Sequence, residues 1–148
     1  MFKVSRRLDY GLQLMITLAA DEENKPQPTA RLAADLHIPL PFLHQIGHSL
    51  MQAGLIKATP GPKGGLKLNL PAKEISTLMV TEALEGPIAL NNCEGCLQPC
   101  DDQANCVIKP FWDNLQQNIV DYMSAIKLPM LINGTIKIPV YHINGTTE

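Results

Sequence analysis

The chain has 148 residues, of which 45% are hydrophobic, 18% charged and 5% aromatic. This composition is typical of a globular protein and excludes a mainly disordered chain. The net charge of −2 is unevenly divided: residues 1–73 hold nine basic and five acidic residues, whereas residues 74–148 hold three and nine. A basic N-terminal half followed by an acidic C-terminal half predicts an anionic partner at one end of the molecule.

The N-terminal segment superficially resembles a secretory signal, because basic residues precede the apolar stretch Leu8–Ala20. Asp9 and Gln13 interrupt that stretch. Its apolar residues recur instead at helical spacing, at Leu8, Leu12, Ile16 and Ala19. This pattern predicts an amphipathic helix over Arg6–Ala20. Since no part of the sequence approaches the roughly eighteen apolar residues of a membrane span, we expect a cytoplasmic protein without a membrane partner.

Two further helices are predicted, over Thr29–Leu36 and from about Leu40 to Ala53, with a tight break at His37–Pro39 between them. The second of these helices has an apolar stripe at Leu43, Ile46, Leu50 and Met51. Gly54 is placed to end it. Two helices separated by a three-residue turn are typical of the helix-turn-helix.

Two short strands follow, over Leu55–Thr59 and Leu66–Leu70, joined by a Gly- and Pro-rich segment at residues 60–65. A hairpin with such a tip directly after a recognition helix is typical of a wing. Residues 1–73 are therefore predicted to form a winged helix-turn-helix DNA-binding domain. The predicted fold class is mainly α with a small β-wing.

The C-terminal half is predicted to begin with a connecting segment, residues 74–90, that contains a helix over Ile75–Leu84. A cysteine-rich loop at 91–107 follows, then a long helix over about Ile108–Leu128 that Pro129 ends, and a tail at 129–148. One face of the long helix carries Phe111, Leu115, Ile119, Tyr122 and Ile126, widened by Trp112, Val120 and Met123. So wide an apolar arc predicts a dimerisation helix and a homodimer, whose symmetry suits palindromic DNA.

Side chains at the exposed start of the second helix of a helix-turn-helix reach base edges in the major groove. Here these are His44, Gln45 and His48, of which Gln45 suits adenine and His44 suits guanine. Basic residues on the helices and the wing are predicted to contact phosphate or enter the minor groove. The remaining predicted DNA-binding residues are Arg6, Arg7, Arg31, Lys57, Lys63, Gly64, Gly65 and Lys67.

All four cysteines lie close together, as Cys93-x2-Cys96-x3-Cys100-x5-Cys106. In a reducing cytoplasm such a group favours a metal site over disulfides, and thiolates suit both zinc and iron–sulfur clusters. A zinc site usually pairs two short knuckles across a longer gap, which this loop lacks. The spacing favours an iron–sulfur cluster, and a zinc site and a thiol redox switch stay open as alternatives.

Several segments resemble those of the Rrf-type regulators, a family that includes IscR, NsrR and RsrR. They are Leu8–Leu12, Ala53–Ile56, Gly61–Leu68 and the stretch from Ile75 to Gly86, within a resemblance that covers residues 2–128. The resemblance implies a dimeric winged helix whose long C-terminal helices cross. It also implies a [2Fe–2S] or [4Fe–4S] cluster, present in many members, that controls operator binding.

The resemblance further implies a set of cluster ligands. The family's three loop cysteines align with Cys93, Cys100 and Cys106, and Cys96 has no regular counterpart. Lys109 stands where the IscR branch has a histidine ligand, and a protonated lysine is a poor ligand. Asp9 matches the aspartate that the partner subunit supplies in the NsrR branch. The chain is therefore interpreted as closer to the NsrR-like branch, with Asp9 or Cys96 as the fourth ligand.

The predicted function is a DNA-binding transcription regulator, a repressor, whose operator affinity an iron–sulfur cluster controls in response to nitric oxide, redox state or cluster status. The alternative with the same fold is a cluster-free or zinc-stabilised regulator that senses through its thiols. An electron-transfer or cluster-carrying enzyme is disfavoured, because the winged head has no catalytic constellation. We therefore expect that the protein is not an enzyme.

Overall fold

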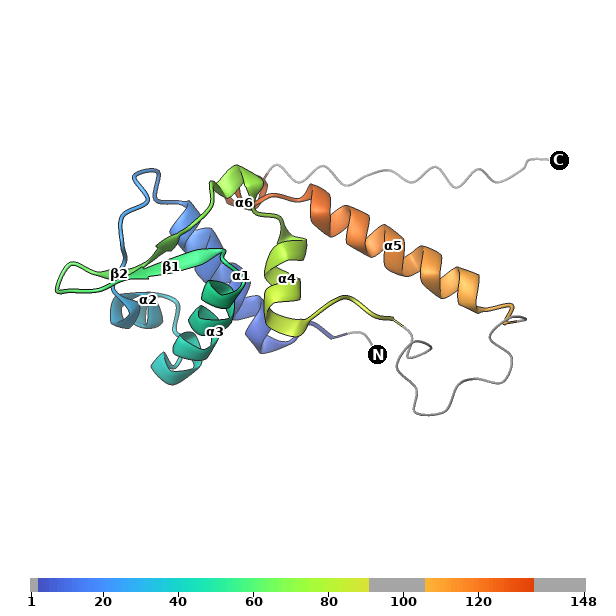
Figure 1. Ribbon diagram of the computed structural model, residues 1–148, viewed down its shortest axis with the longest axis horizontal. Coiled ribbons are helices and arrows are strands. Elements are labelled where there is room, and N and C mark those ends of the chain that lie inside the picture. The colour runs from blue at the N-terminus through green and yellow to red at the C-terminus, as the bar shows by residue number, and fades with distance from the viewer. Residues whose placement is uncertain (1–2, 91–105, 135–148) are drawn as a thin grey trace.

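The computed structural model describes residues 3–90 and 106–134, and shows a winged-helix head from which one long helix extends (Figure 1). The elements in chain order are α1 (Arg6–Ala19), α2 (Thr29–Asp35), α3 (Leu40–Gln52), β1 (Ile56–Thr59), β2 (Gly65–Leu68), the 3-10 helix η1 (Ala72–Glu74), α4 (Thr77–Glu85), α5 (Lys109–Ala125) and α6 (Leu128–Ile132). The predicted fold class, mainly α with a small β-wing, is confirmed. None of the helices in these two ranges is long and apolar enough to cross a membrane.

Helix α1 forms where the sequence predicts it, but a different face is buried. Its start is capped by Ser5, whose hydroxyl accepts a hydrogen bond from the Leu8 backbone N–H at 3.0 Å. The buried residues are Gly11, Leu14, Met15 and Leu18, whereas the predicted stripe of Leu8, Leu12, Ile16 and Ala19 is half-buried. The helix is apolar on both faces, so packing against α3, α4 and α6, and not periodicity, decides which face turns inward.

The helix-turn-helix follows the predicted pattern closely. His37 adopts a left-handed conformation, with φ of 53°, in the tight turn between α2 and α3. Gly54 ends α3 with φ of 73°. The predicted stripe of α3 is buried at Leu43, Ile46 and Leu50 and half-buried at Met51. The opposite side of α3 is thereby left to solvent.

The wing is a two-stranded antiparallel sheet, and the loop between α1 and α2 pairs with its β2 edge. Its register pairs Ile56 with Leu68, Lys57 with Lys67, Ala58 with Leu66 and Thr59 with Gly65. Gln27, in the loop between α1 and α2, exchanges both backbone hydrogen bonds with Leu66, each at 2.9 Å. The Asn24 side chain likewise donates to and accepts from the backbone of Leu68. The loop therefore covers the β2 edge of the wing and fixes the wing to α1.

The end of the long helix differs from the sequence prediction. Helix α5 stops at Ala125, Ile126 is extended, and α6 begins at Leu128. Leu128 donates its backbone N–H to the Ile75 carbonyl at 3.1 Å, and Thr77 donates to the Ile126 carbonyl at 2.9 Å. The prediction that one helix runs to Leu128 and stops at Pro129 was wrong, because proline at 129 lies in the first turn of a new helix, where its missing N–H costs nothing.

One hydrophobic core joins the head, α4 and α6. Its fully buried side chains include Leu14, Met15, Leu43, Ile46, Leu50, Ile75, Val80 and Leu128. Helix α5 contributes no buried residue. The long helix is joined to the head near its C-terminal end, where the Thr77 hydroxyl donates to the Met123 carbonyl at 2.8 Å. Its large apolar side chains are half-buried, except Phe111, which is exposed.

Candidate nucleic-acid interface and cysteine loop

The three side chains expected to read bases lie on the solvent side of α3. His44, Gln45 and His48 are all exposed, because the buried stripe of the same helix occupies the opposite side. Gln45 and His48 are three residues apart, so their side chains are neighbours on the helix surface. The positions meet the geometric requirement for groove reading, and base contact itself stays a prediction.

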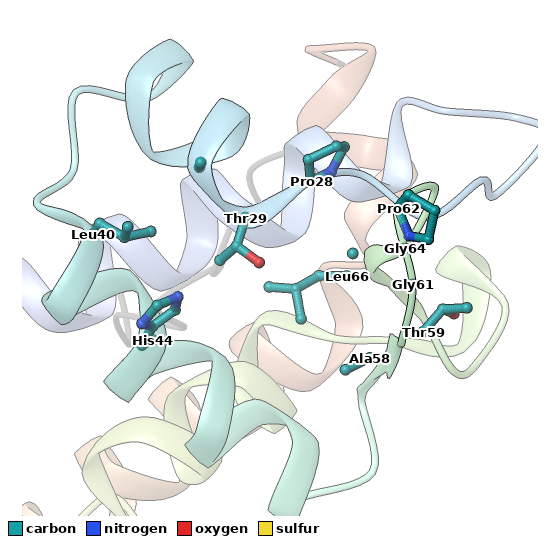
Figure 2. Close-up of a pocket in the computed structure, with 12 residues that line it drawn as sticks. Pro28, Thr29, Leu40, His44, Ala58, Thr59, Gly61, Pro62, Gly64 and Leu66 are labelled. Atoms are coloured by element: carbon teal, nitrogen blue, oxygen red, sulfur yellow. The ribbon is translucent and has the colours of Figure 1, made fainter.

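A hollow of about 450 Å³ lies between α3, the start of α2 and the wing. Figure 2 shows His44 and Leu40 on one side of it, Thr29 at the base of α2, and Thr59, Gly64 and Leu66 on the wing side. His44 therefore faces the wing across the hollow, whereas Gln45 and His48 do not line it. Of the two exposed histidines of α3, only His44 lines the hollow.

The wing lysines also fall into two groups. Lys63 is exposed at the wing tip, between Pro62 and Gly64, which both line the hollow. Lys57 and Lys67 face each other in the antiparallel register. Successive side chains of a strand point to opposite faces, so this pair lies on the face away from the hollow, which the neighbouring residues Ala58 and Leu66 line.

The arginines predicted to bind phosphate have different surroundings. Arg6 is exposed at the start of α1. Arg31 is exposed as well, with its Nε 3.5 Å from the Asp35 carboxylate, a surface pair of little energetic consequence. The Arg7 Nη2 donates to the Ser49 hydroxyl of α3 at 2.7 Å, and its Nε is buried with no hydrogen-bond partner among the described residues. Arg7 therefore contacts the recognition helix in a half-buried position.

The two wing glycines predicted to contact DNA have a structural reason for being glycine. A Cβ at Gly64 would lie 2.0 Å from the Thr59 carbonyl oxygen. Gly65 has φ of 149°, and a Cβ there would lie 2.0 Å from the carbonyl oxygen of Gln27. Sequence reasoning missed Asn24 and Gln27, which close the wing edge, because nothing in the local pattern couples that loop to a strand about forty residues later.

Of the predicted cluster ligands, the structure describes Cys106 and Asp9. Cys106 is half-buried shortly before the start of α5 and forms no disulfide within the described residues. Asp9 is exposed in the first turn of α1, where its carboxylate accepts a hydrogen bond from Gln13 Nε2 at 3.1 Å. Cys93, Cys96 and Cys100 lie outside the described residues. Thiolate and carboxylate are both ligands for iron, so the donor chemistry of the two described residues fits the predicted cluster.

The described residues near the start of α5 include Lys109. Lys109, where the IscR branch has its histidine ligand, places its ammonium nitrogen 2.6 Å from the Asp113 carboxylate. Within residues 3–90 and 106–134, no three His, Cys, Asp or Glu side chains come together as a metal site.

A helix-turn-helix followed by a two-stranded wing defines the winged-helix class of DNA-binding proteins. The model of the Rrf2 family, described as "Iron-dependent Transcriptional regulator", matches residues 4–134. The chain belongs to the Rrf2 family of transcriptional regulators. It is 28% identical over 131 residues to a putative HTH-type transcriptional regulator of Haemophilus influenzae, covering 88% of this chain and 87% of the relative. It is 29% identical over 125 residues to IscR of Pectobacterium carotovorum, covering 84% and 76%.

Solved structures support the same fold. CymR of B. subtilis, the global cysteine regulator, superposes with a TM-score of 0.75 at 25% identity, covering 92% of this chain and 100% of that one. The oxidized form of Staphylococcus aureus CymR gives a TM-score of 0.68 at 30% identity, covering 88% and 96%. The family and these relatives are transcriptional regulators and not enzymes, as predicted. The nearer kinship to the NsrR-like branch stays a prediction.

Proposed function

We propose that the chain is a cytoplasmic, homodimeric repressor that binds double-stranded operator DNA, with α3 in the major groove and the wing in the adjacent minor groove. The observation that carries this proposal is the hollow between α3 and the wing. The sugar-phosphate strand that separates the two grooves would have to pass between these elements. Thr29 and His44, which line the hollow, then donate to phosphate, while Gln45 and His48 face the bases.

The homodimer is inferred from the apolar face of α5, which the described part of the chain covers only in part. Phe111 is 55% exposed, and Leu115, Ile119 and Tyr122 line an open apolar depression further along the helix. A long apolar helix face that the described part of its own chain covers only in part is typical of an interface with a second copy. A two-fold dimer would present two copies of α3 to two half-sites of a palindromic operator.

The finer part of the proposal is that an iron–sulfur cluster controls operator affinity. Cys93, Cys100 and Cys106 would hold it, with Asp9 of the partner subunit or Cys96 as the fourth ligand. When bound, the cluster supplies a centre that reacts with nitric oxide or changes with redox state. The iron-dependent description of the family and the IscR relatives support this assignment. Cys106 precedes α5, and the backbone bonds of Ile75 and Thr77 tie the other end of α5 to the head, so α5 connects loop and head.

A second candidate is a regulator that senses through its thiols without a cluster, or one that zinc stabilises. The observation that favours it is the likeness to CymR, which has been solved in an oxidized form. Cys96, the fourth thiol, would supply a partner for disulfide formation. The DNA-binding part of the proposal is the same for both candidates.

Anaerobic purification separates the candidates. We expect a brown protein that absorbs above about 400 nm, contains iron and sulfide, and lacks stoichiometric zinc. Colourless protein with one zinc per chain would overturn the cluster. The variants Asp9→Ala and Cys96→Ala then identify the fourth ligand, because only loss of the true ligand changes the spectrum. DNA binding is tested with a duplex selected from a random-sequence library, whose affinity should fall steeply with salt.

A further inference from the structure

The Arg7 side chain contacts the recognition helix α3, whereas the side chain of a phosphate-binding arginine would face solvent. We propose that Arg7 is a positioning residue that, through Ser49, fixes the orientation in which α3 reads bases. This inference rests on the proposed DNA-binding function. It assigns to Arg7 sequence specificity, and not the phosphate contact that its place beside Arg6 predicts from the sequence.

The Arg7–Ser49 contact lies close to the residues of α3 that are expected to face the bases. The Arg7 Nη2 donates to the Ser49 hydroxyl oxygen at 2.7 Å, in a half-buried position. Ser49 follows Gln45 by four residues, so the two lie one helical turn apart along the same side of α3. Ser49 also directly follows His48. A displacement of α3 at Ser49 therefore displaces both side chains expected to face the bases.

A second contact between α1 and α3 lies near the other end of α3. The rings of Tyr10 and Phe42 meet edge to face, with centroids 5.8 Å apart at 80°. Phe42 lies in the first turn of α3 and Ser49 in its last turn. Helix α1 therefore contacts α3 near both ends, and loss of the Arg7 contact removes the hydrogen bond between the two helices near the C-terminal end of α3.

The buried Nε of Arg7 argues that the contact serves more than stability. This N–H has no hydrogen-bond partner among the described residues, and a buried unpaired donor costs free energy. A methionine would fill the same space without that cost. A side chain kept at such a cost is expected where the geometry of a functional element depends on it.

The test compares Arg7→Met with Arg6→Met in the full-length protein. Binding is measured against the selected duplex and against a scrambled duplex of the same length and composition, over a range of salt concentrations. We expect Arg7→Met and Ser49→Ala each to lower the preference for the selected duplex about tenfold, a loss typical of one damaged base contact. The salt dependence should not change. Arg6→Met should weaken both duplexes equally and reduce the salt slope by about 0.9.

Two further variants exclude a general structural effect. Ser49→Thr retains the acceptor hydroxyl and should restore the preference, and the double variant Arg7→Met/Ser49→Ala should lose no more than either single variant. Equal weakening of both duplexes with a smaller salt slope in Arg7→Met would make Arg7 a phosphate contact and overturn the inference. An unchanged preference would overturn it as well. If the wild-type protein itself does not discriminate between the duplexes, the proposed function fails.

Discussion

Lys57 lies directly opposite Lys67 in the antiparallel register of the wing, so two positive charges are neighbours, with Lys57 exposed and Lys67 half-buried. Like charges in this relationship destabilise a hairpin, whereas an opposite pair contributes about 0.2–1 kcal/mol. An arrangement that is unfavourable in the free protein becomes favourable when an anion lies over both ammonium groups. The pair is therefore expected to reduce stability and to increase DNA affinity.

The first prediction separates these two effects. Lys67→Glu should raise the free energy of unfolding by about 0.2–1 kcal/mol, because an attractive pair replaces a repulsive one. DNA affinity should fall, with a smaller salt slope. Lys57→Glu should behave in the same way, and the double variant should lose the gain in stability. Urea denaturation and binding titrations check this, and additive effects of the two substitutions would contradict the pairing.

Gly65 supports a second prediction, because its role in the structure is to let the Gln27 backbone approach the wing. Gly65→Ala should destabilise the protein by about 1–3 kcal/mol through its φ of 149° and the contact of the new Cβ with the Gln27 carbonyl oxygen. Gly61→Ala is the matched control, since its φ of 104° is also strained but nothing lies within 4 Å of its Cβ position. Equal losses of stability in the two variants would show that the approach of Gln27 is unimportant.

The order and type of the elements in the head could be predicted from the sequence, because local signals specify each of them. The stripe of Leu43, Ile46 and Leu50 identifies the recognition helix, and Gly54 ends it where predicted. The Gly- and Pro-rich tip identifies the wing. These features depend on residues close together in the chain, and the structure confirms them.

Features that depend on distant residues could not be predicted in this way. The buried face of α1 is selected by helices α3, α4 and α6, and the break at Ile126 exists because Ile75 and Thr77 pair with that segment. The same limit applies to the site. Arg7 and Arg6 are adjacent basic residues in the sequence, and only the position of Ser49 in space distinguishes them.

Leu128 supports a third prediction, on the attachment of α6 to the head. Its side chain is 0% exposed in the common core, whereas Ile132 of the same short helix is 38% exposed. Leu128→Ala should lower the free energy of unfolding by about 2–5 kcal/mol, since it opens a cavity in the head. Ile132→Ala should change it by less than about 1 kcal/mol. Thermal unfolding of the two variants checks this, and similar values would place α6 outside the core.

The fourth prediction tests whether α5 forms the dimer interface. Ile119→Asp places a charge in the apolar depression between Leu115 and Tyr122 and should convert the dimer to a monomer, because burying an unpaired carboxylate costs several kcal/mol. Gln117→Asp introduces the same carboxylate at an exposed position of the same helix and should leave the dimer intact. Sedimentation velocity measures the oligomeric state of each variant.

The monomer should bind a single half-site weakly, since the affinity of a palindromic site depends on both copies of α3. A dimeric Ile119→Asp would show that another surface joins the subunits.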